Sequence, residues 1–232
     1  MVKMVLISFP LILYNTENNM NEIKDILNDF DEWAAQMSRE DRSPEWESEY
    51  PGWMNAYSIF ELWLKNHTLS AIDLETKRDI LKLLAHDSED GVILGLLEDH
   101  PEIGDQVAIS YSDCSDPSAR WQISQYLGNR DSPETISLLE TLLEDTDNYV
   151  RRIALLSLAK RDLLLATSRA RNFLMSNDEY LRMVAITILG DAKPSDLETI
   201  LHTMRNDPSD IVRERVRSLI LDLEDASKSE DS

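Results

Sequence analysis

The segment DNYVRRIALLSLAKRD, residues 147–162, has the pattern of an amphipathic helix. Related segments recur at residues 178–193, DEYLRMVAITILGDAK, and at residues 209–224, SDIVRERVRSLILDLE. Each contains an arginine of a series in which successive members lie 31 residues apart: Arg120, Arg151, Arg182 and Arg213. A chain that repeats one helical segment at a fixed period is typical of a repeat architecture, in which each unit packs on its neighbours.

Apolar residues recur at fixed positions around these arginines. The residue before each arginine, the third after it and the seventh after it are all apolar. These positions share one helical face, so each segment needs a neighbour to bury its stripe. A further helix is indicated before two of the segments, by SPETISLLETLLED (132–145) and PSDLETILHTMRND (194–207), each with a proline near its start. Two helices in each 31 residues predict an all-α, right-handed α-solenoid.

The motif D-x-x-x-x-V-R-x-x-A-x-x-x-L spans Asp145 to Leu158 and is approximated from Asp207 to Ile220. It resembles HEAT repeats and the shorter HEAT-like repeats of the phycobilin-lyase type. The resemblance implies a ladder between adjacent repeats, with the aspartate in the turn and the arginine at the start of the second helix. The matching residues are Asp145, Asp207, Arg151, Arg182 and Arg213. Ser176 and Cys114 occupy the aspartate position in the other two units, so the ladder is expected to be incomplete.

The remaining segments divide the chain into regions. Residues 73–224 are expected to hold about five HEAT-like units, with the period clear from residue 113 and with residues 87–96 as a degenerate second helix. Residues 20–72 carry helical spacing and are expected to form a divergent helical cap. Residues 1–19 are interpreted as an N-terminal extension or a misassigned start, with a buried first element or a signal peptide as alternatives. Residues 225–232 are expected to be a disordered acidic tail.

The charge of the chain is large and unevenly distributed. The net charge is −21, and residues 1–144 alone hold 28 acidic and 10 basic side chains, whereas residues 145–217 hold 11 and 12. Such a field repels phosphate backbones and anionic lipids, which argues against nucleic acid and membrane as ligands and favours a basic protein partner. The single cysteine cannot form an internal disulfide, so a reducing, cytoplasmic location is expected.

The sequence offers little that is typical of catalysis. Its four histidines are scattered, and it has no G-x-S-x-G, Walker loop, G-x-G-x-x-G or C-x-x-C motif. A metal site can be drawn from His86, Asp87, Asp90 and His100, but solvated loops often combine such residues without a metal. We therefore expect no catalytic residue, no metal and no cofactor.

A segment outside the clear repeats combines aromatic rings with carboxylates. RSPEWESEYPGWMNAY, residues 42–57, suits protein recognition, although the same rings would also serve to close the first helices, with solvated glutamates between them. Acidic turns between residues 87 and 105 extend the same charge. The predicted partner-binding residues are Trp46, Glu47, Glu49, Tyr50, Trp53, Asp87, Glu89, Asp90, Glu98, Asp99 and Trp121.

These observations predict a non-catalytic, protein-binding solenoid that is monomeric when free. The interpretation taken first is neutralisation of a basic protein, as an immunity protein inhibits a nuclease-like toxin domain. It depends on repeat class, size and charge, and on no motif. One alternative is a general protein-interaction scaffold or adaptor. The other is an enzyme of the HEAT-like DNA glycosylase or bilin lyase type, for which a basic DNA-binding surface is missing from the sequence.

Overall fold

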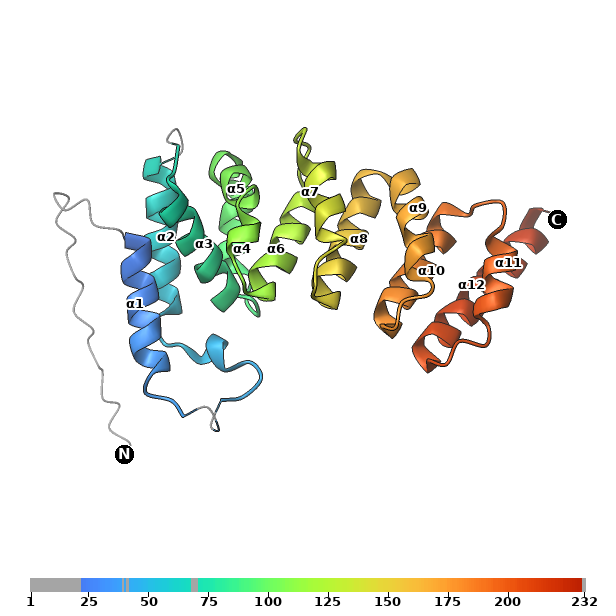
Figure 1. Ribbon diagram of the computed structural model, residues 1–232, viewed down its shortest axis with the longest axis horizontal. Helices are drawn as coiled ribbons and strands as arrows, with labels where there is room; N and C mark the ends of the chain where they lie inside the picture. The colour runs from blue at the N-terminus through green and yellow to red at the C-terminus, as the bar shows by residue number, and fades with distance from the viewer. Residues whose placement is uncertain (1–21, 39, 41, 68–70, 231–232) are drawn as a thin grey trace, which may run out of the picture.

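The computed structural model describes residues 22–38, 40, 42–67 and 71–230 (Figure 1). These residues form helices and connecting turns, with no strand among them: α1 (Glu22–Ala34), η1 (Trp46–Glu49), α2 (Trp53–His67), α3 (Leu74–His86), α4 (Val92–Asp99), α5 (Pro101–Ala108), η2 (Tyr111–Asp113), α6 (Pro117–Gly128), α7 (Thr135–Leu142), α8 (Asn148–Arg161), α9 (Leu163–Phe173), α10 (Glu179–Ala192), α11 (Leu197–Met204) and α12 (Asp210–Glu230). The predicted N-terminal extension, residues 1–19, lies outside them.

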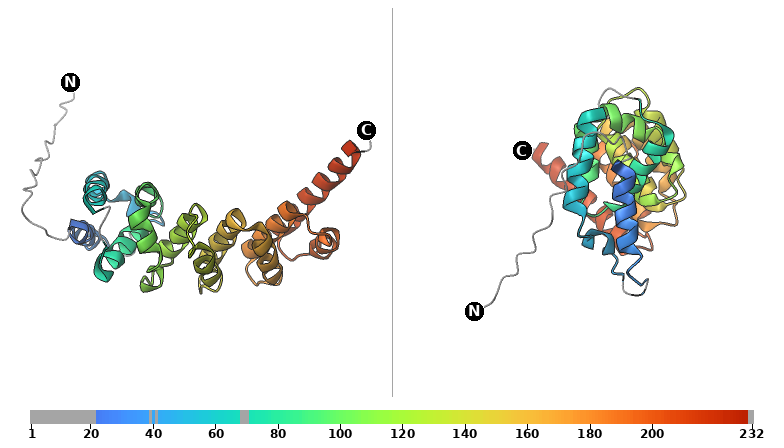
Figure 2. Two further views of the ribbon diagram at one scale, coloured as in Figure 1. Left: turned by 90° about the horizontal axis from the view of Figure 1, so that it is seen from above. Right: turned by 90° about the vertical axis from the view of Figure 1, so that its left-hand side faces the viewer.

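The helices follow one another in a single row from α1 to α12, and the row is bowed (Figures 1 and 2). The second helices of the repeats pack directly on one another, α6 on α8, α8 on α10 and α10 on α12. The first helices, α7, α9 and α11, pack chiefly on these second helices. This two-layer stack confirms the predicted α-solenoid.

The N-terminal units keep the layers but not the predicted helix assignment. The helix that packs on α6 and on α1 is α3, so α3 is the second helix of its unit. Residues 87–96, predicted as a degenerate second helix, instead form the turn after α3 and most of α4, which packs on α2 and α5. The chain reverses at Gly91, whose φ of 66° places it in the left-handed region that glycine adopts readily. Apolar spacing alone cannot reveal this reversal.

Aspartates determine where several helices begin. The carboxylates of five aspartates accept hydrogen bonds from backbone N–H groups in the first turns of α3, α6, α8, α9 and α10: Asp73, Asp116, Asp147, Asp162 and Asp178. The first N–H groups of a helix have no partner within the helix, and such caps satisfy them.

Two arginine–aspartate pairs join the second helix of one repeat to the turn between the helices of the next, and we call each a rung. Arg120 donates from Nε and Nη2 to the two carboxylate oxygens of Asp145, at 2.7 and 3.0 Å. Arg182 makes the same pair of bonds to Asp207, each at 2.8 Å. Every rung joins a second helix to the turn 25 residues further along the chain. The hydrogen bonds from Arg182 lower the pKa of Asp207, so this carboxylate stays charged.

Glycines let the second helices approach closely. A Cβ atom added at Gly128 of α6 would lie 2.7 Å from Ser157 Oγ and 3.1 Å from Ser157 Cα of α8. At Gly190 of α10 it would lie 2.5 Å from a methyl carbon of Leu219 in α12. The two helix pairs therefore meet at distances that alanine would not permit without a shift.

Aromatic rings fill the core of the N-terminal region. Phe30 of α1 is buried, and five rings surround it at centroid distances between 4.2 and 5.8 Å: Trp33, Trp46, Tyr50, Trp53 and His86. We call this group the aromatic cap. Aromatic pairs at such distances contribute beyond the area that they bury.

The C-terminal helix is longer than expected. We expected order to end at residue 224, but α12 continues to Glu230, and residues 231–232 lie outside the described chain. Residues 225–230 contain no glycine or proline, so no residue there strongly disfavours a helix. The sequence reasoning relied on the missing apolar side chains, which remove packing but not backbone hydrogen bonds.

Candidate protein-binding surface

A row of large side chains runs across three second helices, α6, α8 and α10. Trp121 of α6 contacts Tyr149 of α8 edge to face, with ring centroids 5.4 Å apart. The Arg152 guanidinium lies 4.7 Å from the ring of Tyr149 and 4.7 Å from the ring of Tyr180 in α10. We call these four residues the aromatic strip. It links three consecutive second helices, α6, α8 and α10.

Arg152 is held by ring contacts instead of a carboxylate. Among the described residues it forms no ion pair, and its buried Nε finds no hydrogen-bond acceptor. Tyr149 and Tyr180 remain 42% and 45% exposed, so both rings are accessible while they contact the guanidinium. Cation–π contacts position a cation but do not neutralise its charge, so this surface retains donor capacity.

An apolar depression is lined chiefly by α8 and α10, two of the helices that carry the aromatic strip. It has a volume of about 510 Å³, and its lining includes Ile153, Leu156 and, from the start of α9, Leu163. Leu156 is 37% exposed, and Leu163 is 41% exposed. The sequence reasoning selected Trp121 on this face but missed Tyr149, Arg152 and Tyr180. The two tyrosines could have been found from the sequence, because each lies two positions before a repeat arginine, at an exposed position of its helix. Arg152 directly follows the repeat arginine Arg151.

Two residues predicted to contact a partner are instead core residues. Tyr50 and Trp53 are each 5% exposed and pack in the aromatic cap. The Tyr50 hydroxyl donates to Asp29, and Trp53 Nε1 donates to the Glu47 carbonyl at 2.8 Å. Burial around Phe30 corrects the expectation that these rings are open to a partner, and it favours the alternative in which they close the first helices.

The other predicted residues of this segment lie at the edge of the aromatic cap. Trp46 is half-buried, stacks on Trp33, and carries Arg42 at 3.9 Å from its ring. The Glu47 carboxylate contacts His86 Nδ1 at 2.9 Å. Glu49 is exposed and accepts a hydrogen bond from the Ser43 hydroxyl at 3.1 Å, a short-range contact within the loop.

Asp87, also predicted to contact a partner, is a buried structural residue. It is 2% exposed and accepts hydrogen bonds from the Tyr57 hydroxyl at 2.5 Å and from the Ile93 N–H at 2.6 Å. Burial raises its pKa to about 6, although both hydrogen bonds act against the rise. Asp87 thus fixes the turn between α3 and α4, which corrects its assignment to the surface.

The remaining acidic residues lie near the ends of α4. Glu89, Asp90 and Asp99 are exposed, whereas Glu98 accepts a hydrogen bond from the Asn129 side chain at 2.7 Å. Trp121 belongs to the aromatic strip. The predicted set is therefore divided among the aromatic cap, the α4 region and the second-helix face, and it does not form one surface.

The residues from which a metal site was drawn are not brought together. His86 contacts Glu47, and His100 Nδ1 lies 3.6 Å from Glu102, each in a separate pair. In the described part of the chain, no group of three or more His, Cys, Asp or Glu side chains is placed to hold a metal ion. No described helix combines the length and apolar character needed to cross a membrane.

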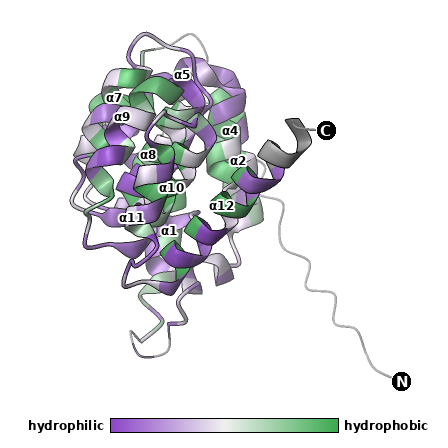
Figure 3. Ribbon diagram, turned by 90° about the vertical axis from the view of Figure 1, so that its right-hand side faces the viewer, coloured by the Kyte–Doolittle hydropathy of each residue, from purple (hydrophilic) through white to green (hydrophobic). Residues whose placement is uncertain are grey.

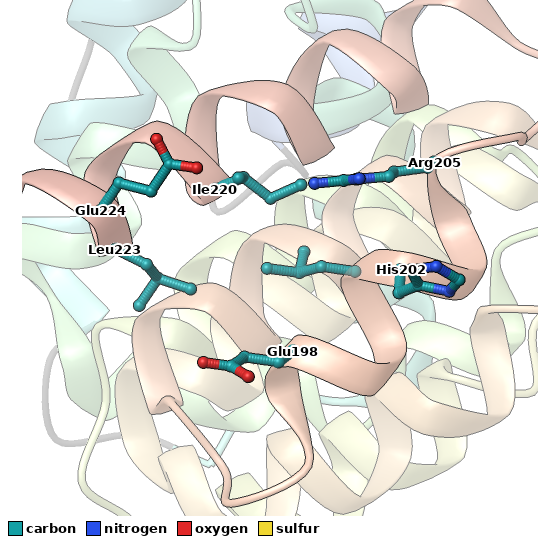
Figure 4. Close-up of a pocket in the computed structure, with 7 residues that line it drawn as sticks. Glu198, His202, Arg205, Ile220, Leu223 and Glu224 are labelled. Atoms are coloured by element: carbon teal, nitrogen blue, oxygen red, sulfur yellow. The ribbon is translucent and has the colours of Figure 1, made fainter.

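The C-terminal end of the stack carries a further groove. Seen from this end, α7, α9 and α11 lie on one side, beside α8 and α10 (Figure 3). The groove has a volume of about 340 Å³ and lies between α11, with Leu201 and His202, and α12, with Ile220 and Leu223 (Figure 4). It is the side on which a further helix pair would stack. Its lining includes no aromatic residue besides His202, so the aromatic strip is the stronger candidate for recognition.

Comparison with known proteins supports the repeat assignment. Residues 106–176 match the family model for HEAT repeats, a range that ends after α9. The crystal structure of an engineered protein from the Northeast Structural Genomics Consortium is similar to the chain with a TM-score of 0.48 and 15% sequence identity, over 74% of this chain and 83% of that one. None of the curated proteins matches the chain in sequence. The family match supports HEAT-like repeats over a region that includes Trp121, Tyr149 and Arg152 of the aromatic strip and ends before Tyr180.

Proposed function

We propose that this protein is a non-catalytic protein-interaction scaffold that binds a partner polypeptide along the aromatic strip. The observation that carries the proposal is the placement of Trp121, Tyr149, Arg152 and Tyr180 in one row, in which both tyrosines are exposed and the other two residues are half-buried. Trp, Tyr and Arg are the residue types that most often dominate binding energy at protein interfaces. HEAT-like repeats support the same class of function, because solenoids offer an extended surface for binding.

The geometry of the aromatic strip favours a partner segment that runs along the row of helices. Packed helices are about 8–10 Å apart, and an extended chain advances about 3.3 Å per residue. Such a segment would therefore meet a new second helix about every three residues, first Trp121, then Tyr149 with Arg152, then Tyr180. Because the rings already hold the Arg152 side chain, binding costs less side-chain entropy than with a mobile arginine.

Substitution on the two helix layers tests this proposal. The variant Y149A/Y180A removes both rings that hold Arg152, and Leu164→Ser, on a residue of α9 that is 85% exposed, is the control on the first-helix layer. We expect Y149A/Y180A to lose at least about tenfold in affinity for a partner identified with the unaltered protein, and the control to lose less than twofold. Circular dichroism establishes that both variants fold. Equal affinity of the two variants would exclude the aromatic strip as the binding surface.

We propose as a second candidate that the N-terminal half neutralises a basic protein, as an immunity protein binds a toxin domain. The supporting observations are the excess of acidic side chains in residues 1–144 and the exposure of Glu49, Glu89, Asp90 and Asp99. Exposed charges of one sign accelerate encounter with an oppositely charged partner and make it sensitive to salt.

Charge reversal separates the two candidates. The variant E89K/D90K/D99K alters exposed side chains near α4 and leaves the aromatic strip intact. A basic partner should associate with this variant at least about tenfold more slowly, with a weaker dependence on salt. A partner held by the aromatic strip should bind the variant and the unaltered protein alike, which would exclude neutralisation by the acidic region for that partner.

A further inference from the structure

The ladder of rungs is interrupted at its middle position. Arg120 and Arg182 each pair with the residue 25 positions later, which is an aspartate in both cases. The arginine between them, Arg151, has Ser176 at the equivalent position. Among the described residues Arg151 forms no ion pair, although it belongs to the same series and begins the same kind of helix.

Ser176 keeps one of the two roles of the missing aspartate. In the rungs, Asp145 Oδ1 also accepts the N–H of Asp147, and Asp207 Oδ1 accepts the N–H of Ser209, each at 2.8 Å. Ser176 Oγ likewise accepts the N–H two residues later, at 3.1 Å. The turn is therefore formed as in the other repeats, but the carboxylate that would neutralise Arg151 is absent from it.

Arg151 consequently adopts a different set of contacts. Its Nε donates to the Leu143 carbonyl at 3.1 Å, and its Nη1 donates to Asn148 Oδ1 at 3.2 Å. The guanidinium lies 5.0 Å from the centroid of the Phe173 ring. Both acceptors are neutral, so the positive charge has no compensating carboxylate in these contacts.

An open depression of about 500 Å³ lies at this position. Its lining is rich in hydrogen-bond donors and includes Arg151, Arg169, Asn172 and Asn177, and Met175 beside them is 88% exposed. The depression is therefore polar, accessible from solvent, and flanked by an apolar side chain that can pack against a polypeptide.

Acidic groups also line the depression, but they do not occupy the vacant position. Asp178 accepts the Leu181 N–H as the cap of α10, Glu144 is exposed, and Arg169 pairs with Glu140. The complete rung at Arg182 forms although Asp178 is among the acidic groups acting on that arginine. Nearby acidic side chains are thus compatible with a carboxylate bound in the rung geometry.

We infer that the interrupted rung at Arg151 is a binding site for an aspartate or glutamate side chain of a partner polypeptide. On binding, Arg151 Nε would leave the Leu143 carbonyl, and the guanidinium would donate from Nε and Nη2 to both carboxylate oxygens, as Arg120 and Arg182 do within the chain. The inference rests on the proposed function only in that the ligand is a polypeptide. Its site is distinct from the aromatic strip, so either one can fail alone.

The test follows the Nε–Hε resonances of ¹⁵N-labelled protein by NMR during titration with a capped peptide, acetyl-Ala-Asp-Ala-amide. We expect the Arg151 resonance to shift in the millimolar range, and the matched peptide acetyl-Ala-Asn-Ala-amide to produce at most one-fifth of that shift. Sodium acetate, with sodium chloride to match ionic strength, is the third titrant. An equal response to acetate and to the aspartate peptide would overturn the assignment to a polypeptide.

The substitution Ser176→Asp provides the decisive control. It supplies the missing carboxylate from within the chain, so the Arg151 resonance should move toward those of Arg120 and Arg182, and the peptide response should disappear. Ser176→Ala, which adds no carboxylate, should retain the response. A peptide response that persists in Ser176→Asp, or an Arg151 resonance unchanged by that substitution, would overturn the proposal.

Discussion

The aromatic cap and the repeats from α6 onward stabilise the same layered arrangement by different means. In the aromatic cap, five aromatic side chains gather around Phe30, and the connections between helices are irregular. In the repeats, small apolar residues and Arg–Asp rungs recur at fixed spacing. The first region depends on non-directional burial, and the second adds directional hydrogen bonds that define how one unit meets the next.

This difference shows which part of a solenoid needs which kind of interaction. An end unit has a neighbour on one side only, so it must bury enough apolar surface within itself. An internal unit shares its core with both neighbours, and its main requirement is the correct register.

The substitution Phe30→Ala should separate the two regions. Phe30 is 2% exposed at the centre of the aromatic cap, so its loss should lower the free energy of unfolding by about 4 kcal/mol. Four of the five tryptophans lie in the N-terminal region, at 33, 46, 53 and 63. Tryptophan fluorescence in urea should therefore report unfolding at a lower concentration than circular dichroism.

The control for Phe30→Ala is Met54→Ala, on a side chain of α2 that is 78% exposed. It should change the free energy of unfolding by less than about 0.5 kcal/mol. If fluorescence and circular dichroism still report one shared transition in Phe30→Ala, the aromatic cap and the repeats unfold as one unit, and the division fails.

The substitution Arg182→Met should be the next most damaging. It leaves the carboxylate of Asp207, whose side chain is 4% exposed, without its cation, and we expect a loss of about 3 kcal/mol in urea denaturation. Arg161→Met breaks a pair with Asp131, which is 95% exposed, and should cost less than about 1 kcal/mol. Similar losses from the two variants would show that rungs act as ordinary surface pairs.

The substitution Asp87→Asn should change how stability depends on pH. The pKa of Asp87 is raised from 3.8 to about 6, so the folded state favours the protonated form, and stability should fall as pH rises from about 4 to about 6. The free energy of unfolding of the unaltered protein, minus that of Asp87→Asn, should fall by about 2 kcal/mol over this range and then stay constant. Urea denaturation between pH 4 and 7 measures it.

The rungs provide the contrast for this pH dependence. The pKa of Asp207 is lowered, chiefly by its hydrogen bonds with Arg182, so its contribution is lost only as pH falls below the ordinary value of 3.8. The free energy of unfolding of the unaltered protein, minus that of Asp207→Asn, should therefore stay constant between pH 4 and 7. A slope for Asp207→Asn equal to that for Asp87→Asn would contradict the assignment of the pH response to the turn after α3.

The repeats were predictable because their information is local and periodic. The spacing of Arg120, Arg151, Arg182 and Arg213 placed four second helices. In the structure, an aspartate four residues before each of the first three arginines caps its helix. Both signals depend on helix geometry and capping, which act within a few residues.

The candidate site was less predictable because it depends on contacts between distant residues. The composition of residues 42–57 did not reveal that Tyr50 and Trp53 face Phe30, since the sequence does not state which rings meet. Similarly, Tyr149 and Tyr180 are 31 residues apart, and only packing of α8 on α10 places both against Arg152.

The close approaches at Gly128 and Gly190 also influence the curvature of the molecule. When second helices approach more closely than first helices, the second-helix layer is the shorter of the two, and the row bends toward it. A methyl group at Gly128 would meet Ser157 down to its Cα and would widen that side and flatten the bend, whereas at Gly190 it would first displace the tip of the Leu219 side chain. The shape that the protein presents to a partner thus depends in part on a position at which a side chain is absent.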